Sequence, residues 1–88
     1  MVLKQKYIRT NDDKIIVFSE LQQHKEFRNF SPVSAGFISF FTTKVEHNMQ
    51  YYYETDCKCY GESVSLNLKS NEEEDTFLAQ KQILGHLK

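Results

Sequence analysis

The sequence contains few of the features that point directly to a chemistry or to a special environment. Its 88 residues include no tryptophan, one proline, three glycines and two cysteines, and the formal net charge is −1. Because the charges nearly cancel, no field of one sign is available to attract nucleic acid or anionic lipid. No segment rich in Pro, Gly or Ser divides the chain, and no internal repeat is present. We therefore expect residues 1–88 to form a single globular domain.

Long apolar runs are also missing. No run approaches the roughly eighteen apolar residues that a membrane helix requires, so we expect no membrane association. Only Val2 and Leu3 separate the first Met from the first charge, whereas a secretory leader carries about seven to fifteen apolar residues. These two absences predict a cytoplasmic protein.

The two cysteines are too sparse for a disulfide framework. Cys57 and Cys59 stand two positions apart, so on one strand their Cα atoms lie about 6.5–7 Å apart, at or past the limit for an unstrained bridge. We expect reduced thiols that pack as small hydrophobic groups. A zinc site completed by His24, His47 or His86 is the alternative, but structural zinc usually needs two paired elements. We therefore predict no metal and no cofactor.

What the sequence does have is a strongly apolar segment at 32–41. Its residues Phe37, Ile38, Phe40 and Phe41 place apolar groups on both sides of an extended chain. A strand that is apolar on both faces is typical of the middle of a sheet. The rest of the chain is expected to pack around this strand.

The flanking segments predict the order ββαβββα. A hairpin is expected in residues 4–18 with its turn at 11–13, followed by a helix of about 20–29 that begins at a capping box formed by Ser19 and Gln22. Pro32 ends this helix before a strand of about 34–45. A turn at 46–49 then leads into the alternating strand 50–60.

The last third predicts one more strand and a second helix. Gly61-Glu62 suits a tight turn before a strand at 63–69 that points Val64, Leu66 and Leu68 inward. A second capping box at 70–73 starts a helix of about 71–84, with Gly85 after its end. We expect an α+β fold with a five-stranded, mainly antiparallel sheet and the C-terminal helix packed on it. A small, partly open β-barrel with helices is the alternative.

Two segments give the chain a resemblance to a known family. Together with His24, they are Pro32-Val33-Ser34-Ala35-Gly36-Phe37-Ile38 and Cys59-Tyr60-Gly61-Glu62-Ser63-Val64-Ser65-Leu66. The chain resembles a family of small uncharacterised bacterial proteins that share VSAGF and CxGxSxSLxLxS segments. The resemblance covers nearly the whole chain and implies a compact bacterial domain without an assigned activity or transferable site.

One candidate polar site combines His24, Cys59 and Ser63. A catalytic histidine needs a nucleophile and an orienting acid within hydrogen-bond reach, and these residues lie on elements that could approach one another. The alternative interpretation is a histidine at the edge of the core bonded to a backbone carbonyl, which we favour. We therefore assign no catalytic residue and do not expect an enzyme.

The candidate binding surface is aromatic. Alternation places Tyr52, Lys58 and Tyr60 on the wet side of strand 50–60. Aromatic sheet surfaces with basic residues stack bases in RNA-binding modules, but Glu54 and Asp56 share this face. Tyrosines on a sheet face are also typical of protein interfaces. We predict a non-catalytic protein-interaction domain that forms a homodimer through this face or an open sheet edge. The alternatives are a nucleic-acid-binding accessory protein and a small Cys/His-dependent hydrolase or metal-binding protein.

Overall fold

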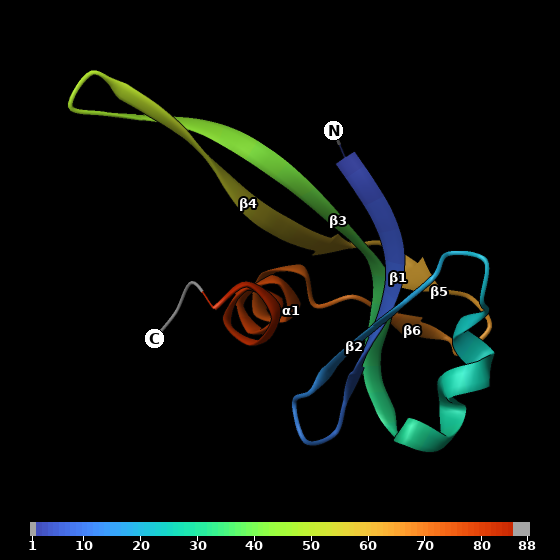
Figure 1. Cartoon of the computed structure of the whole chain (residues 1–88). Coiled ribbons are helices and arrows are strands. Elements are labelled where there is room, and N and C mark those ends of the chain that lie inside the picture. The colour runs from blue at the N-terminus through green and yellow to red at the C-terminus, as the bar shows by residue number, and fades with distance from the viewer. Residues whose placement is uncertain (1, 86–88) are drawn as a thin grey trace.

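The predicted apolar strand lies inside an antiparallel sheet. The computed structural model describes residues 2–85, and its main sheet has the order β2-β1-β3-β4 (Figure 1). These strands span Val2–Thr10 (β1), Ile15–Phe18 (β2), Pro32–His47 (β3) and Gln50–Tyr60 (β4). The α+β class, the antiparallel pairing and the turn at 11–13 are confirmed. Because β2 and β4 form two separate edges, the sheet is open and the barrel alternative is not formed.

The middle of β3 is shielded on both faces, as its apolar sequence predicts. Ser34, Ala35, Gly36 and Ile38 are buried, and Phe37 is half-buried. Gly36 has a steric reason to lack a side chain, because a Cβ at this position would collide with the carbonyl oxygen of Tyr60. Because Gly36 has no side chain, the backbone at Tyr60 and Gly61 can pass close to β3 at this point.

Each face of the sheet is covered by a different layer. Helix α1 (Glu72–Ala79) and the π-helical turn η2 (Gln80–Leu84) cover one face. The 3-10 helix η1 (His24–Phe30) and the short strands β5 (Glu62–Ser63) and β6 (Leu68–Lys69) lie on the other side (Figure 1). Tyr7 and Ile8 are adjacent on β1, so they point to opposite faces and anchor two separate clusters. The clusters contain Tyr7, Ile38, Cys57, Cys59 and Ala79, and Ile8, Phe18 and Ala35.

The first helix differs from the prediction in its start and its type. The Ser19 hydroxyl caps only a turn, by accepting a hydrogen bond from the N–H of Leu21. The helix begins after Gln23, where Gln23 and Glu26 form the capping box, and it is a 3-10 helix of seven residues. The capping box that forms begins at Gln23, four residues after Ser19, which explains the shift.

The predicted strand 63–69 is wrong as a fifth member of the main sheet. Only β5 and β6 are extended, and they pair with each other in a separate two-stranded sheet. Asn67 adopts a left-handed φ of 55°, and its N–H donates to the carbonyl of Val64, which closes a turn. Val64 is consequently 86% exposed, although alternation places it inward.

The C-terminal helical segment occupies the predicted range, but its N-cap differs. Asn71 is the N-cap, whereas Ser70 donates its hydroxyl to the carbonyl of Gly61. Asp75 and Ala79 are buried, whereas the apolar side chain of Phe77 is exposed. Gly85 has the expected left-handed conformation with φ of 67°, and Leu87 lies outside the described residues.

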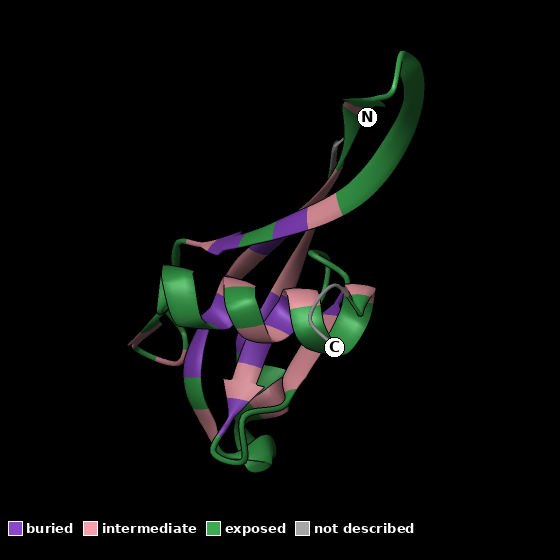
Figure 2. Cartoon of the chain, turned by 90° about the vertical axis from the view of Figure 1, so that its left-hand side faces the viewer, coloured by how far each residue is buried: buried purple, intermediate pink, exposed green. Residues whose placement is uncertain are grey.

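The hairpin of β3 and β4 extends well beyond the body of the domain. Among the described residues, β1 pairs with β3 only as far as the Val2–Phe41 pair. Residues 42–55, which we call the arm, continue as a two-stranded ribbon that ends in a turn at Asn48 and Met49. Both turn residues have positive φ, the signature of a type I′ hairpin. The arm is exposed along almost its whole length (Figure 2).

Candidate functional site

The three residues of the predicted aromatic surface do not form one patch. Tyr52 pairs with Val45 on the arm, whereas Tyr60 pairs with Phe37 in the body. At a rise of about 3.3 Å per residue, Tyr52 and Tyr60 lie about 26 Å apart along β4. Lys58 is exposed between them, opposite Ser39. The alternation itself agrees with the prediction, but these residues cannot contact one small ligand together.

Tyr60 has a structural role at the base of β4. Its hydroxyl forms a 3.0 Å hydrogen bond with the hydroxyl of Ser39, and its ring centre lies 6.0 Å from that of Phe37. The Lys4 ammonium group lies 4.4 Å from the centre of the Phe37 ring, where it makes a cation–π contact. Tyr60 is therefore part of a packed cluster and contributes little to an exposed surface.

The arm presents the most exposed aromatic side chains of the sheet. Tyr51, Tyr52 and Tyr53 are 60%, 46% and 71% exposed, and Met49 at the tip is 90% exposed. The Lys44 ammonium group lies 4.2 Å from the centre of the Tyr51 ring. Amphipathic aromatic and methionine side chains are enriched in protein interfaces. The exposed aromatic surface is thus formed by Tyr51, Tyr52 and Tyr53 on the arm, and only Tyr52 belongs to the surface predicted from the sequence.

The outer backbone edge of β4 changes character between the body and the arm. A two-residue type I′ turn makes His47 and Gln50 a hydrogen-bonded pair, so the odd-numbered residues of β4 point their backbone groups away from β3. In the body, the N–H of Cys57 donates to Asp56 Oδ1 at 2.8 Å, and the N–H of Cys59 donates to Thr76 Oγ1 at 2.9 Å. The outer edge is therefore capped beside the body.

On the arm, the same edge has no such caps. Tyr51, Tyr53 and Thr55 share the outward orientation of Cys57 and Cys59. Within residues 2–85, no side chain accepts a hydrogen bond from their N–H groups. An uncovered edge strand is a template for pairing with another chain, and natural proteins usually block such edges. The arm therefore offers both backbone hydrogen bonds and aromatic side chains.

A groove of about 660 Å³ adjoins the β4 edge where the arm meets the body. It lies between β4 and α1 and is lined by Phe41, Asp56, Cys57, Lys58, Glu72, Glu73, Thr76, Phe77 and Gln80. Phe77 is 51% exposed here, and Gln80 Nε2 donates to Asp56 Oδ1 at 2.8 Å. The groove thus combines apolar walls with acidic side chains. The sequence does not reveal it, because it depends on how far α1 reaches along β4.

The structure does not bring His24, Cys59 and Ser63 together. His24 and Ser63 line a second groove on the η1 face, whereas Cys59 packs beneath α1. The His24 ring donates through Nε2 to the carbonyl of Gly36 at 2.8 Å, which confirms the packed-histidine interpretation. Burial lowers the pKa of His24, and this backbone hydrogen bond opposes the shift. Ser63 Oγ accepts a hydrogen bond from the N–H of Leu66, so the Ser63 side chain stabilises a turn.

The two cysteines are free and buried, as predicted. Burial raises the pKa of Cys57 to about 11 and that of Cys59 to about 12, so both thiols are protonated at neutral pH. Within residues 2–85, no group of three His, Cys, Asp or Glu residues could hold a metal ion. The thiols therefore behave as small core side chains.

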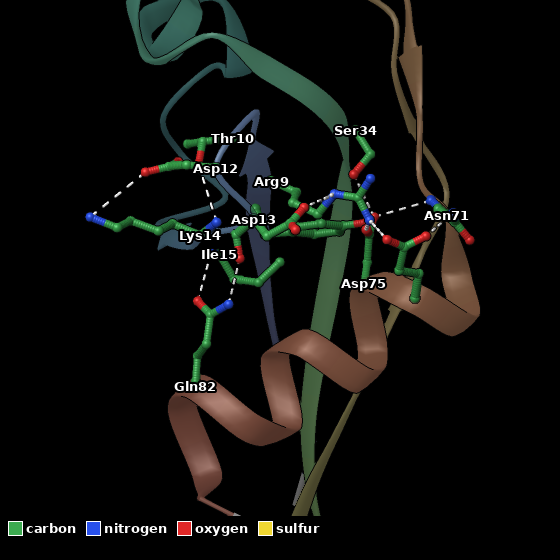
Figure 3. A network of polar contacts seen from close by, with 12 residues as sticks. Arg9, Thr10, Asp12, Asp13, Lys14, Ile15, Ser34, Asn71, Asp75 and Gln82 are labelled. Atoms are coloured by element: carbon green, nitrogen blue, oxygen red, sulfur yellow. Dashed lines mark hydrogen bonds and ion pairs between the residues drawn. The ribbon is translucent and has the colours of Figure 1, made fainter. Parts of the chain in front are cut away.

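A buried polar cluster beneath α1 is not predicted by the sequence analysis. Asp75 is fully buried, and its Oδ2 accepts hydrogen bonds from Tyr7, from Ser34 at 2.7 Å and from the N–H of Asn71 at 3.0 Å (Figure 3). The Arg9 guanidinium group lies 3.1 Å from Asp75 Oδ1 as an ion pair without hydrogen-bond alignment. The sequence feature that could have indicated this cluster is Arg9. Alternation places this charged residue on the same face of β1 as Tyr7.

This cluster connects elements rather than binding a ligand. Burial, with contributions from Asp75, raises the pKa of Tyr7 far above its ordinary value, so the phenol stays protonated and donates to the carboxylate. The hydrogen bonds join β1, β3 and the start of α1. Because Asp75 is enclosed, the cluster positions α1 beside β4 and thereby shapes the groove.

Comparisons with protein-family models, curated proteins and solved structures found no match for this chain. The resemblance to small bacterial proteins with VSAGF and CxGxSxSLxLxS segments therefore stays a prediction. Among residues 2–85, no helix has the length and apolar character to cross a membrane.

Proposed function

We propose that the chain is a non-catalytic protein-interaction domain that self-associates through the arm. One observation carries this proposal: β4 is capped along its outer edge beside the body and uncapped along the arm. The uncapped part coincides with the three exposed tyrosines. An open edge and an aromatic surface on the same segment favour pairing with another chain.

The energetics of the arm point the same way. A two-stranded ribbon by itself is marginally stable in water, and residues 42–55 receive no cover from β1 or β2. Exposed tyrosine and methionine side chains add apolar area that would be buried on association. Pairing with a partner strand would both satisfy the open edge and cover this area.

A second copy is the partner that the charge balance fits best. The charged residues of the arm are Lys44, Glu46 and Glu54, and the whole chain has a formal charge of −1. Two copies therefore repel each other only weakly. Nucleic acid would meet more acidic than basic side chains on the arm. The aromatic edge is therefore better suited to a protein strand than to a phosphate backbone.

Sedimentation equilibrium at micromolar concentrations tests this function. The unmodified chain should sediment as a dimer. Tyr53→Pro should sediment as a monomer with an unchanged circular dichroism spectrum. Because Tyr53 points its N–H away from β3, proline removes this outward donor and the exposed ring without removing a hydrogen bond to β3. Val64→Ala, which alters an exposed apolar side chain on the body, is the control and should remain dimeric.

A clean monomer for the unmodified chain would contradict self-association. A dimer that persists in Tyr53→Pro would place the contact away from the arm. Retention on single-stranded DNA or RNA that weakens steeply with salt would instead support the nucleic-acid alternative.

A further inference from the structure

The open edge restricts how two arms can pair. In an antiparallel pair around a two-fold axis, residues with outward backbone groups must lie opposite one another. On the arm these residues are Tyr51, Tyr53 and Thr55. This rule allows the axis at any position from 51 to 55. An axis at 51 would place Tyr53 opposite the turn residue Met49, and an axis at 55 would place Tyr53 and Tyr51 opposite Cys57 and Cys59, whose N–H groups already have acceptors. Positions 52, 53 and 54 remain, and each has a different consequence.

An axis at position 54 is the least favourable. It would place Glu54 opposite Glu54 of the second copy, and like charges directly opposite are destabilising. It would also place Tyr51 opposite Cys57, whose N–H already donates to Asp56. An axis at position 52 pairs Tyr51 with Tyr53 but leaves Thr55 opposite Met49. Met49 has a φ of 64° and cannot continue a strand.

An axis at position 53 uses the whole open edge. Tyr53 then lies opposite Tyr53, and Tyr51 lies opposite Thr55 in both copies, so all three outward residues form hydrogen-bonded pairs. Tyr52 lies opposite Glu54, which separates the two Glu54 carboxylates. Tyr51 and Tyr53 of both copies share one face, where they form an aromatic ladder.

The same register brings the tip of one arm to the groove of the other copy. With the axis at Tyr53, Met49 of the second copy lies opposite Cys57, one of the residues that line the groove between β4 and α1. Met49 is 90% exposed in the single chain, and the groove has exposed apolar surface at Phe77. A flexible methionine suits an irregular apolar groove.

The charges of the tip and the groove are also compatible. Asp56, Glu72 and Glu73 line the groove together with the basic residue Lys58, so acidic side chains outnumber basic ones there. The tip, residues 47–50, has the sequence His-Asn-Met-Gln and carries no acidic side chain. An acidic tip would be repelled from this groove.

We infer that two copies pair antiparallel along β4 with the two-fold axis at Tyr53, and that the Met49 tip of each copy occupies the groove of the other. This inference rests on the proposed self-association and adds the register and a second contact. It assigns the groove to a second copy of the chain.

Disulfide trapping tests the register. Tyr53→Cys should form an intermolecular disulfide under mild oxidation, because a directly opposed hydrogen-bonded pair has a Cα separation of about 5.5 Å. Tyr52→Cys should not, because the two positions would be about 8 Å apart in this register. The unmodified chain is the control, since Cys57 and Cys59 are buried.

A charge substitution tests the groove. Met49→Glu should raise the dimer dissociation constant at least about tenfold, since it brings a carboxylate to the acidic groove twice per dimer. Val64→Glu adds the same charge on the body and should leave the constant within about twofold. Adding Glu73→Lys to Met49→Glu should restore part of the affinity.

The outcomes separate this inference from the proposed function. A dimer trapped by Tyr52→Cys and not by Tyr53→Cys would overturn the register, and so would a dimer trapped by neither variant. A dimer unaffected by Met49→Glu would overturn the groove contact. A monomeric unmodified chain would instead contradict self-association itself, and the inference would fail with it.

Discussion

The Arg9 guanidinium group lies 3.1 Å from the fully buried carboxylate of Asp75, which ties β1 to the first turn of α1. Glu74 also pairs with Arg9, at 3.0 Å, but its side chain is 53% exposed. Two adjacent acidic residues thus contact one arginine in very different surroundings. The buried pair should matter much more to stability than the exposed pair.

Asp75→Ala should lower the free energy of unfolding by about 3–5 kcal/mol, because it leaves Arg9 without its buried partner and Tyr7 and Ser34 without an acceptor. Glu74→Ala is the matched control and should cost less than about 1 kcal/mol, since solvent screens the exposed pair. Urea unfolding followed by circular dichroism measures both. Equal losses in the two variants would show that Asp75 has no special structural role.

Stability should decrease in mild acid because of His24. Burial lowers the folded-state pKa of His24 below the ordinary value of 6.5. The unfolded chain therefore binds a proton first, so the contribution is complete above pH 6.5 and is lost as the pH falls toward the folded-state pKa. His24→Gln should reduce the change of the urea midpoint with pH in this window, whereas His47→Gln on the exposed arm should not. An unchanged slope in His24→Gln would assign the effect to other groups.

The two thiols should react only when the chain unfolds. Burial raises the pKa of Cys57 to about 11 and of Cys59 to about 12, above the ordinary value of 9.0. The folded state therefore favours the protonated thiols, so their contribution is complete below pH 9 and is lost as the pH rises toward 11 and 12. At pH 8, a thiol reagent should label the unfolded chain fully and the native chain slowly. Immediate labelling of the native chain would contradict the burial of both side chains.

Much of the fold follows from local sequence patterns. The apolar residues of segment 32–41 indicate an internal strand, Pro32 marks its start, and Gly85 ends the last helical turn, as the structure confirms. These features depend on periodicity and on backbone restrictions, which act over a few residues. The start of the first helix is harder to predict, because Ser19 begins a sequence that fits a capping box, whereas the box forms at Gln23, which lacks the usual Ser or Thr.

The candidate site depends on features that local patterns do not contain. Alternation identifies Tyr51 and Tyr53 as one face of β4, but it cannot show that the covering layer ends near Cys57 and leaves both tyrosines exposed. Asp75 belongs to an acidic run that suits a helix N-terminus, so its burial against Arg9 depends on how α1 docks. Tertiary docking determines both the exposed arm and the groove.

Residue-specific amide hydrogen exchange at several protein concentrations tests most directly whether the open edge of β4 is the contact. The N–H groups of Tyr51, Tyr53 and Thr55 should exchange rapidly at low concentration and become protected as the concentration rises. The N–H groups of Cys57 and Cys59, which already have acceptors, should show little change. Exchange at Tyr51, Tyr53 and Thr55 that stays fast while the chain dimerises would contradict pairing through the arm.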